Sequence, residues 1–511
     1  MPEELLKKWN ERIKPEWRLA FIAALLIGFF THMYVFTNML PNHDGLINIY
    51  NTQRKFGSGR FFLGSFSGIS SYFDLPWVIG SLSILYLSIM SVLLTELFEL
   101  KKKLSIILTA GLIITFPTVA ATFSYMFTAD GYMAGNLLAV LAILVTKKYK
   151  LGFLAGAVIL FVSVGIYQAN LTLILTVISI WFIRELLFQT VSIKSFFLYL
   201  LRYVSMTVIG MGLYTLTFKA YQIWFGGTIT DYQGLNEVGT TAGTYSDQFS
   251  KIKEASLEFF FRGFVTTNPI KLFELLNVGL LILVVLILLV VAIQKKIYVK
   301  PVHFLLLIFC IVSLPILSFS LYFVSPGVEY HMLMVMALSS FYLLPIILYD
   351  RLEVPTFGAR LNSWGVVVFV SLTIFNFALI DNIAYFNMTL KYEKSYALVN
   401  RILDRVEQTE GYEDVEKLFV YGRVTMKTKN ASERIPENIP TMTGAMGEII
   451  LAQPYHYQYM LANYFGKSLK LANEREQEAI LNSEEFLEMP VWPANGSIKI
   501  VDHIAIIKLS E

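Results

Sequence analysis

The sequence predicts an α-helical polytopic membrane protein with about eleven transmembrane helices and a small C-terminal α/β domain. Hydrophobic residues make up 55% of the 511 residues and charged residues only 15%, whereas soluble domains usually carry about a quarter charged residues. The mean hydropathy is +0.58. Apolar stretches recur as far as residue 382, and the composition then becomes polar. These observations favour a chain that crosses the membrane many times before its last domain.

The N-terminal segment, residues 1–18, has two interpretations. Four apolar residues recur at every fourth position from Leu5 to Trp17, among several basic residues. This pattern is typical of a helix that lies in the membrane interface, here with a bend near Pro15. A frayed tail is the alternative. The segment does not resemble a cleaved signal peptide, because it is long and charged and has no small-residue cleavage site.

Eleven apolar stretches predict the transmembrane part, residues 19–382. A membrane-spanning helix needs roughly 20 mostly apolar residues. The stretches are 19–40, 76–98, 104–124, 129–146, 151–168, 170–188, 195–217, 271–294, 302–324, 331–349 and 363–382. The fourth to sixth stretches are short and closely spaced, so we expect tilted or re-entrant helices there.

Basic residues predict the orientation in the cell membrane. If the N-terminus is cytoplasmic, every loop on that side carries Lys or Arg, as the positive-inside rule requires. These basic residues are Lys101, Lys102, Lys103, Lys147, Lys148, Lys150, Arg184, Lys194, Lys295, Lys296, Lys300, Arg351 and Arg360. An odd number of spans then places the C-terminal domain, residues 383–511, outside the cell, together with the loops 41–75 and 218–270.

The C-terminal domain is expected to mix helices with strands. A charged helix leads into a predicted strand at 417–421, and the stretches around "YHYQY" and "NEREQEAIL" predict helices. The alternation in "SIKIVDHIAIIKLS" predicts a hairpin that turns near Asp502. The domain could bind an acceptor, cover the active site or act as a structural cap. Trp492 and Asn495 suit sugar binding, although a buried aromatic at a turn is the commoner role of such a tryptophan.

Several classes of function are disfavoured. The sequence has no P-loop, no nucleotide-binding glycine fingerprint, no HExxH motif and no nucleophile elbow. Its six histidines show no metal-ligand spacing, so a divalent metal is not indicated, and no cofactor is expected. The only cysteine, Cys310, cannot form a disulfide within the chain. A net charge of +3 gives no reason to expect nucleic acid as a partner.

Two aspartates on the expected outer side are the candidate catalytic residues. Asp44 follows the first span, and Asp130 lies between the third and fourth spans in "SYMFTADGYMAGN". Ionisable groups at membrane depth are costly, so each is a functional hypothesis. The alternative is that each aspartate caps the following helix.

Other polar residues on the outer side are candidate substrate-binding residues. Cations are expected to hold a phosphate, for which the planar fork of arginine is well suited, or to snorkel to lipid headgroups. Amides suit sugar hydroxyls, and tyrosine also fits an aromatic belt. The candidates are His43, Arg54, Lys55, Arg60, Tyr167, Gln168, Asn170, Glu329 and His331. The helical spacing from Phe62 to Phe73 further predicts a helix in the outer interface.

A lipid-linked sugar as substrate would explain this polar cluster. Its phosphate lies at headgroup depth, where a carboxylate could take the proton of an acceptor hydroxyl as general base. Nearby cations would stabilise the departing phosphate. The position of Asp44 beside Arg54 and Arg60 fits both requirements.

The sequence resembles the GT-C superfamily of polytopic glycosyltransferases, and within it the bacterial Gtr type-II glucosyltransferase family. The stretches that carry the resemblance are "NHDGL", "GRFFLGSFSGISSYFDLPWVIGSLSILYLSIMSVLL", "TFSYMFTADGYMAGNLLAVLA", "GIYQANL" and "MPVWPANGSIKIVDHIAIIKL". The resemblance extends from about residue 20 to the end, and it is most pronounced from Asp44 to Asn170.

The resemblance implies a GT-C-like fold and a reaction. The implied donor is polyprenyl-phosphate-glucose, and the implied product is a glucosyl branch on a surface polysaccharide such as O-antigen or a wall polymer. It assigns Asp44 as the base, makes Asp130 a second essential acid and implies inversion at the anomeric carbon. It further implies a separate donor synthase and a flippase as partners.

Two other functions were weighed against the transferase. A transporter or flippase for a lipid-linked glycan would show broken helices and polar residues near the middle of the membrane, often in repeated halves. This sequence has few charges within its spans and no evident repeat. A membrane-anchored binding protein would not need eleven spans.

Overall fold

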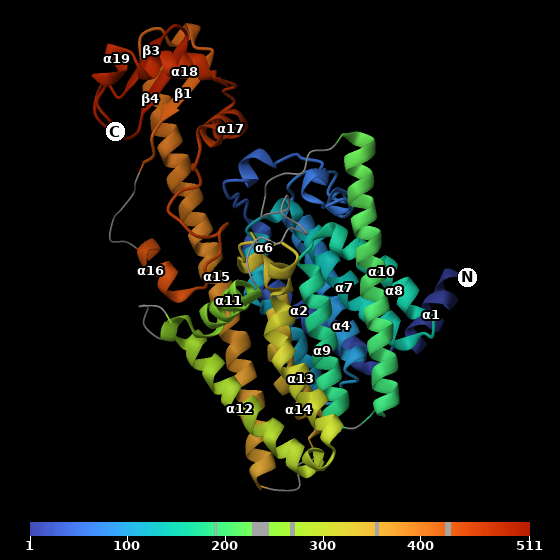
Figure 1. The fold of residues 1–511 in the computed structure, drawn as a ribbon. Coiled ribbons are helices and arrows are strands. Elements are labelled where there is room, and N and C mark those ends of the chain that lie inside the picture. Colours follow the sequence, from blue (N-terminus) through green and yellow to red (C-terminus); the bar gives the residue numbers. More distant parts are fainter. Residues whose placement is uncertain are drawn as a thin grey trace.

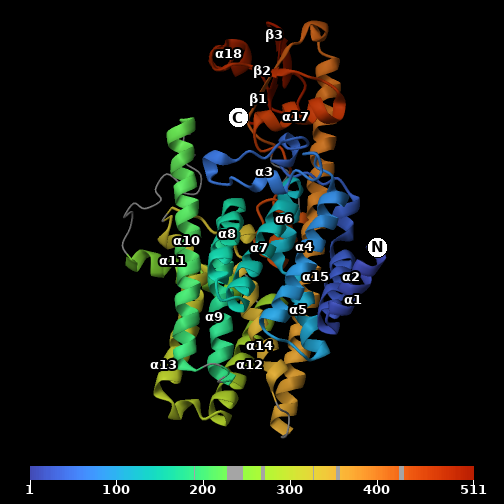
Figure 2. The same cartoon turned by 90° about the vertical axis from the view of Figure 1, so that its right-hand side faces the viewer.

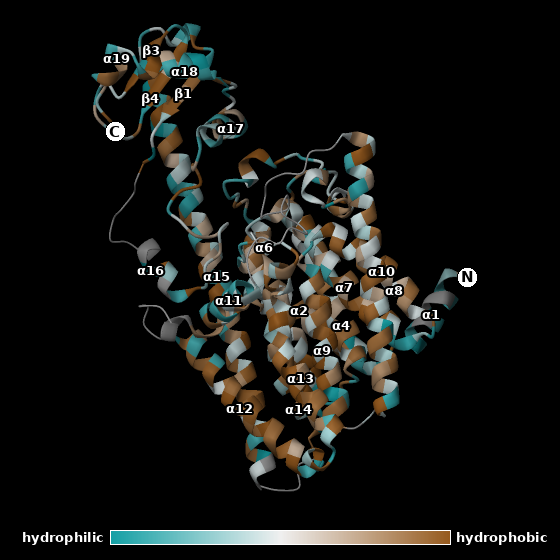
Figure 3. Ribbon diagram, viewed as in Figure 1, coloured by the Kyte–Doolittle hydropathy of each residue, from teal (hydrophilic) through white to brown (hydrophobic). Residues whose placement is uncertain are grey.

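A computed structural model describes residues 1–188, 190, 192–226, 245–265, 271–325, 327–352, 357–424 and 431–511. Most helices form one bundle, and a long helix leads from it to a small domain that contains a sheet (Figure 1). Hydrophobic residues dominate the helices of the bundle, whereas the small domain carries many hydrophilic ones (Figure 3). This division agrees with a membrane part followed by a domain in water.

The bundle consists of helices that differ widely in length. They are α1 (Pro2–Arg12), α2 (Pro15–Thr37), α3 (Leu63–Phe66), α4 (Pro76–Leu97), α5 (Lys103–Thr115), α6 (Pro117–Phe123), α7 (Ala129–Lys148), α8 (Gly152–Ile166), α9 (Asn170–Phe188), α10 (Ile193–Phe225), α11 (Tyr245–Val265), α12 (Leu272–Gln294), α13 (Pro301–Ser318), α14 (Ser339–Arg351) and the first part of α15 (Phe357–Glu407). Proline occupies the first turn of α2, α4, α6 and α13. Its missing N–H is not needed at that position, so it favours a helix start.

Among the described residues, nine helices are long and apolar enough to cross a membrane. The apolar helix α8 has only 15 residues, and α14 has 13. Each of the eleven predicted stretches contains helix. The multi-pass architecture is therefore confirmed, while the number eleven stays a prediction.

Basic loops that are distant in sequence meet at one end of the bundle, here called the basic end. The carboxylate of Glu99 binds Lys147 at 3.0 Å, Arg184 at 2.8 Å and Arg351 at 3.1 Å, so it joins the ends of α4, α7, α9 and α14. The opposite end, from which α15 continues toward the small domain, is called the domain end. Four of the five predicted inner loops are thus joined at one end of the bundle.

Helix α15 connects the bundle to the small domain. It has 51 residues and is about 75 Å long at 1.5 Å per residue, and Figure 2 shows it running the length of the bundle and beyond. The predicted domain boundary at residue 383 falls inside this continuous helix.

The small domain contains a four-stranded sheet with the order β2-β1-β4-β3. Its elements are α16 (Ala431–Asn438), α17 (Pro454–Phe465), α18 (Glu474–Leu481), α19 (Glu484–Leu487), β1 (Lys417–Tyr421), β2 (Lys470–Leu471), β3 (Ile498–Val501) and β4 (Ile504–Lys508). Strand β1 is parallel to β2 and β4, and β3 and β4 form an antiparallel hairpin. The predicted strand at 417–421 and the predicted hairpin are both confirmed.

Alternation along β1 gives this sheet two apolar faces. Leu418 and Val420 belong to a buried cluster with residues of α15 and α17. Phe419 belongs to a second cluster with Ile480 of α18 and Phe486 of α19. The domain therefore has helices on both sides of its sheet, as an α/β domain requires.

The loop between α2 and α4 differs from the prediction. The expected interfacial helix from Phe62 to Phe73 is only the four-residue α3. Ser71 and Tyr72 have φ angles of 55° and 67°, which are incompatible with a continuing right-handed helix. The helix break near Pro15 is confirmed, because α1 ends at Arg12 and α2 begins at Pro15.

One residue of this loop belongs to the core of the small domain. Leu46 is fully buried in the cluster that contains Tyr457 and Met460 of α17. The Nδ2 of Asn463 on α17 also donates a hydrogen bond of 3.0 Å to the Leu46 carbonyl oxygen. The small domain therefore contacts the loop directly, two residues beyond Asp44.

Candidate active site

A polar cavity of about 770 Å³ lies at the domain end of the bundle. Four segments of the bundle and one residue from the segment before α17 line it. Eight of the predicted site residues line the cavity: His43, Asp44, Arg54, Lys55, Arg60, Tyr167, Glu329 and His331. Residues that are up to 288 positions apart thus converge, because the loops at this end fold over the same space.

Asp44 stands on a tight turn at the edge of this cavity. It is the N-cap of a 3₁₀ helix, Gly45–Ile47, and its carbonyl oxygen accepts a hydrogen bond of 2.8 Å from Asn48 Nδ2. The preceding Asn42 holds the turn from the other side, since its Oδ1 accepts the Gly45 N–H at 2.7 Å. The Asp44 side chain is 41% exposed. The backbone is therefore fixed, while the carboxylate is accessible to a substrate.

His43 flanks the Asp44 carboxylate, with 3.7 Å between His43 Nε2 and Asp44 Oδ2. Burial lowers the pKa of the His43 imidazole; the Asp44 charge opposes this shift, and the positive charge of Lys391 adds to it. His43 is therefore neutral near pH 7. A neutral His43 can exchange a hydrogen bond with the Asp44 side chain but does not form an ion pair with it.

Arg60 is held by two tyrosines. Its guanidinium carbon lies 5.1 Å from the ring centre of Tyr167 and 5.9 Å from that of Tyr132, and its Nη1 donates to Tyr132 Oη at 2.9 Å. The turn before Arg60 requires glycine, because Gly59 has a φ of 71° and an added Cβ would lie 2.2 Å from Tyr214 Oη. Stacking fixes the plane of the guanidinium, which suits recognition of a planar or tetrahedral anion.

Arg54, Lys55 and Glu329 lie at the exposed rim of the cavity. His331 lies deeper, on the segment before a 3₁₀ helix, Met332–Met334, and its Nδ1 is 3.2 Å from the Glu329 carbonyl oxygen. The cavity thus has exposed cations at its rim around a half-buried arginine and a half-buried histidine.

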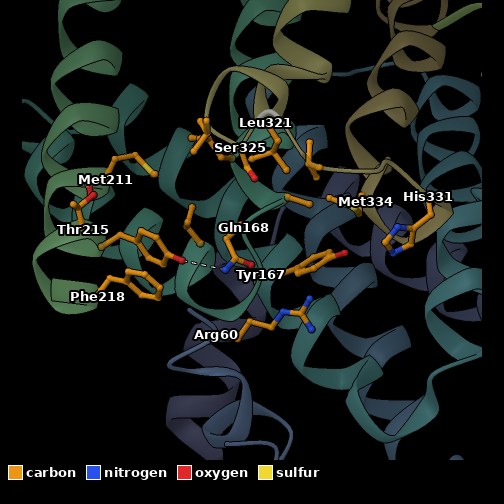
Figure 4. Close-up of a pocket in the computed structure, with 16 residues that line it drawn as sticks. Arg60, Tyr167, Gln168, Met211, Thr215, Phe218, Leu321, Ser325, His331 and Met334 are labelled. Carbon is orange, nitrogen blue, oxygen red and sulfur yellow. Dashed lines mark hydrogen bonds between the residues drawn. The ribbon is translucent and has the colours of Figure 1, made fainter. Parts of the chain in front are cut away.

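An apolar groove adjoins the polar cavity. Side chains from α10, from the segment after α13 and from the loop before α9 line it, among them Met211, Tyr214, Phe218, Leu321, Val328 and Met334. Arg60, Tyr167 and His331 line both the groove and the cavity. Figure 4 shows Arg60 and Tyr167 between the α10 side chains and His331. The two spaces therefore meet at these three residues.

Gln168 and Asn170 have mainly structural contacts. Gln168 lines the groove, not the polar cavity, and its Nε2 donates to the Ser58 carbonyl at 2.6 Å and to Tyr214 Oη at 3.0 Å. Asn170 is buried and donates to the Ser163 carbonyl at 2.9 Å. Both amides join helix ends to neighbouring elements.

Asp130 lies outside the set of residues that line the cavity. Its side chain is fully buried at the start of α7, and its Oδ1 accepts the Gly131 N–H at 2.8 Å. It is close to Asp74, which sequence analysis did not select. Burial, and secondarily the charge of Asp130, raises the pKa of Asp74 to about 7. Both acids are buried, and Tyr132, two residues after Asp130, does line the cavity.

Sequence analysis also missed other lining residues, among them Asn48, Tyr125, Phe127, Tyr132 and Thr443. Tyr125 and Tyr132 occur in "SYMFTADGYM" on either side of Asp130. That spacing was the one available signal, since a tyrosine near each side of an outer acid could have marked a shared site. Thr443 carries no comparable signal.

Among the described residues, no group of three or more His, Cys, Asp or Glu side chains is arranged to hold a metal ion.

The sequence model of the family "Glucosyl transferase GtrII" matches residues 33–349, which include every lining residue of the polar cavity except Thr443. The chain belongs to the GtrII glucosyl transferase family. Family membership supports glycosyltransferase activity for this multi-pass protein. Searches of curated proteins and of solved structures gave no significant match.

Proposed function

We propose that this GtrII-family protein transfers a sugar, most simply glucose, from polyprenyl-phosphate-glucose to a surface polysaccharide. The reaction takes place on the extracytoplasmic side of the cell membrane, with Asp44 as general base and with inversion at the anomeric carbon. A GT-C-like fold and an O-antigen or wall-polymer acceptor belong to the same proposal.

The junction of the apolar groove and the polar cavity carries this proposal. A lipid-phosphate-sugar consists of an apolar chain, an anionic group and a polar ring, in that order. The protein offers an apolar groove, then Arg60, Tyr167 and His331, then a polar cavity. The order of the three surfaces matches the order of the three parts of the donor, which favours a lipid-linked sugar over a free nucleotide sugar.

The proposed chemistry uses groups that are already in place. The acceptor oxygen forms a bond to C1 of the sugar, and Asp44 receives the hydroxyl proton. The bond between C1 and the phosphate oxygen breaks, and its electron pair leaves with the lipid phosphate. Arg60 stabilises the charge that develops there, and His331 lines the same junction of groove and cavity.

Other residues fit supporting roles in this proposal. Arg54 and Lys55 at the exposed rim attract the anionic donor from the membrane surface. Glu329 and Asn48 face the cavity and can bind sugar hydroxyls. Buried Asp130 acts on the site only through its neighbours, because its side chain is not exposed.

The orientation and partners are also proposed from the arrangement of charges. The ion pairs of Glu99 gather basic loops at one end, and the positive-inside rule makes that end cytoplasmic. The cavity and the small domain then lie outside the cell. A donor made inside must be moved across, which calls for a separate synthase and a flippase.

A transporter for lipid-linked glycans is the less favoured candidate. A transporter needs a site that both sides of the membrane can reach near the midplane. Here the cavity lies at the domain end, whereas the basic end is closed by ion pairs between α4, α7, α9 and α14. Family membership also supports the transferase.

Replacement of Asp44 by asparagine tests the proposal. Asparagine keeps the shape of the side chain but cannot accept the proton, so transfer should fall by roughly 10²- to 10⁴-fold. The assay uses membranes, labelled polyprenyl-phosphate-glucose and polysaccharide from cells that lack the gene for this chain. Asp502→Asn, at an exposed turn of the small domain, is the matched control.

Normal transfer by Asp44→Asn at normal expression would remove Asp44 as the base. Movement of the labelled lipid across vesicle membranes by the wild type, without any transfer, would instead support the transporter.

A further inference from the structure

The polar cavity has a second end, where the lining residues come from segments that do not line the apolar groove. There, Tyr125 lies between His43 and Phe127, with ring centres 6.1 Å and 6.3 Å away. Its hydroxyl is 3.1 Å from Thr443 Oγ1. Tyr125, Phe127 and Thr443 line the cavity but do not line the groove. This second end is here called the aromatic end.

The aromatic end has a surface that suits a sugar ring. Tyr125 and Phe127 are half-buried, so part of each ring is accessible in a cavity that is otherwise polar. Binding pockets commonly combine such aromatic surface with a few polar groups that fix the orientation of the ligand. An aromatic face can cover the C–H face of a pyranose, while the hydroxyls of Tyr125 and Thr443 can bond to its edge.

The wall that carries Thr443 is rigidly attached to the bundle. Lys391 on α15 is 3% exposed, and its Nζ donates to the carbonyl oxygens of Gly444 at 3.0 Å and of Met446 at 2.5 Å. Asn387 Nδ2 donates to the Ala445 carbonyl at 2.6 Å. A buried lysine is costly unless its hydrogen bonds are satisfied, so these bonds hold the segment in one place.

Glycine brings the same wall against Tyr125. A Cβ added to Gly444 would lie 2.0 Å from Ser124 Oγ, so the backbone of this segment is packed directly against the residue before Tyr125. Thr443 and Tyr125 therefore keep a fixed separation, although they are 318 residues apart.

We propose that the aromatic end is the acceptor subsite, where a saccharide ring of the polysaccharide binds against Tyr125, Phe127 and Thr443. This inference rests on the proposed function. Asp44 and His43 lie beside this subsite, while Arg60, Tyr167 and His331 lie where the groove begins. The acceptor hydroxyl therefore approaches from the side of the small domain, and the donor approaches from the membrane.

Steady-state kinetics of Phe127→Ala and Thr443→Val test the subsite. Each variant removes contact with the acceptor ring and leaves the donor contacts intact. The KM for the polysaccharide should rise roughly 3- to 10-fold, while the KM for polyprenyl-phosphate-glucose stays unchanged. Tyr50→Ala is the matched control, since Tyr50 is an exposed aromatic of the same outer loop region and does not line the cavity.

A rise in the donor KM, or an unchanged acceptor KM in both variants, would overturn the subsite. Thr443→Val protects the test against misfolding, because it keeps the size of an exposed side chain.

A binding measurement separates this inference from the proposed function. Direct titration of the detergent-solubilised protein with the same polysaccharide requires no transfer. Weaker binding by Phe127→Ala than by wild type supports the subsite even if the reaction proves to be different. Equal binding by both proteins overturns the subsite alone, and absence of binding by the wild type overturns both the subsite and the polysaccharide as acceptor.

Discussion

Replacement of Arg60 by methionine should distinguish the proposed phosphate site from a structural arginine. Arg60 is the one cation that lines both the groove and the cavity among the described residues. Methionine retains a long side chain that can pack beside Tyr167, but it removes the charge and all N–H donors. The change therefore separates the electrostatic role from the packing role.

The size of the effect follows from the charge on the leaving phosphate. A hydrogen bond to a charged group contributes about 1.5–3 kcal/mol, and a donor aimed at developing charge typically changes kcat by about 10²- to 10³-fold. Loss of the bond from Arg60 to Tyr132 and of the stacking on Tyr167 affects folding instead. That contribution should be only about 1 kcal/mol, because the arginine is half-buried.

The assay measures initial rates of sugar transfer in membranes over a range of donor concentrations. Arg60→Met should lower kcat by roughly 10²- to 10³-fold, and Arg60→Lys should recover part of this loss because it restores the charge without the planar fork. Arg54→Met is the matched control, since it removes the same charge from the exposed rim of the cavity. Arg54→Met should lower kcat only a few-fold.

A rate for Arg60→Met within about threefold of wild type, with normal expression, would refute the reasoning, because the phosphate interaction is expected to contribute far more. A larger loss in Arg54→Met than in Arg60→Met would also refute it, and would move the phosphate to the rim.

Two further predictions concern the contacts around the site. Leu46→Ala should lower the free energy of unfolding by about 2–5 kcal/mol and should also reduce the rate of sugar transfer. Ile480→Ala, on the other face of the sheet, should lower stability but not the rate of transfer. Equal transfer rates for the two variants would contradict this prediction. The pKa of Asp74 is raised from 3.8 to about 7, so the folded state keeps a proton that the unfolded state loses, and stability should fall as pH rises from 4 to 7. Asp74→Asn should reduce this fall without abolishing it, because the buried carboxyl group of Asp130 remains. Thermal unfolding in detergent at pH 5 and pH 8 measures the effect, and the same pH dependence in both proteins would disprove it.

Much of the fold could be predicted, because the membrane allows few backbone structures for an apolar segment. Each apolar stretch must form a helix to satisfy its backbone, and basic loops alternate with the outer ones. The prediction of a helix from Phe62 to Phe73 was wrong because tertiary contacts hold this segment in another conformation. Its aromatic residues anchor an irregular segment, whose Phe62 N–H bonds to the Gly165 carbonyl of α8 at 3.0 Å. A spacing of four residues cannot distinguish such anchors from a helix face.

The candidate site was predictable in part for a related reason. Residues at the outer ends of the spans had to meet at one end of the bundle, and Asp44, Arg60 and His331 do so. The sequence could not tell which polar groups are occupied by the fold itself. Asn170 donates a hydrogen bond to a backbone carbonyl, and Asp130 is buried outside the cavity lining. In the sequence, both look like the lining residues, since all are polar residues near the ends of apolar stretches.

The small domain packs against the loop that carries Asp44, although the family match ends at residue 349. A separable domain would contact the bundle only through its linker, α15. Instead, the core of this domain encloses Leu46, and Asn463 binds the carbonyl of the same residue. Asp44 is the N-cap of the turn that contains Leu46, so the position of the proposed base depends on both parts of the chain. The segment before α17 also supplies Thr443 to the cavity. A bundle without the small domain would therefore lose Thr443 from the cavity lining and the packing around Leu46 beside the proposed base.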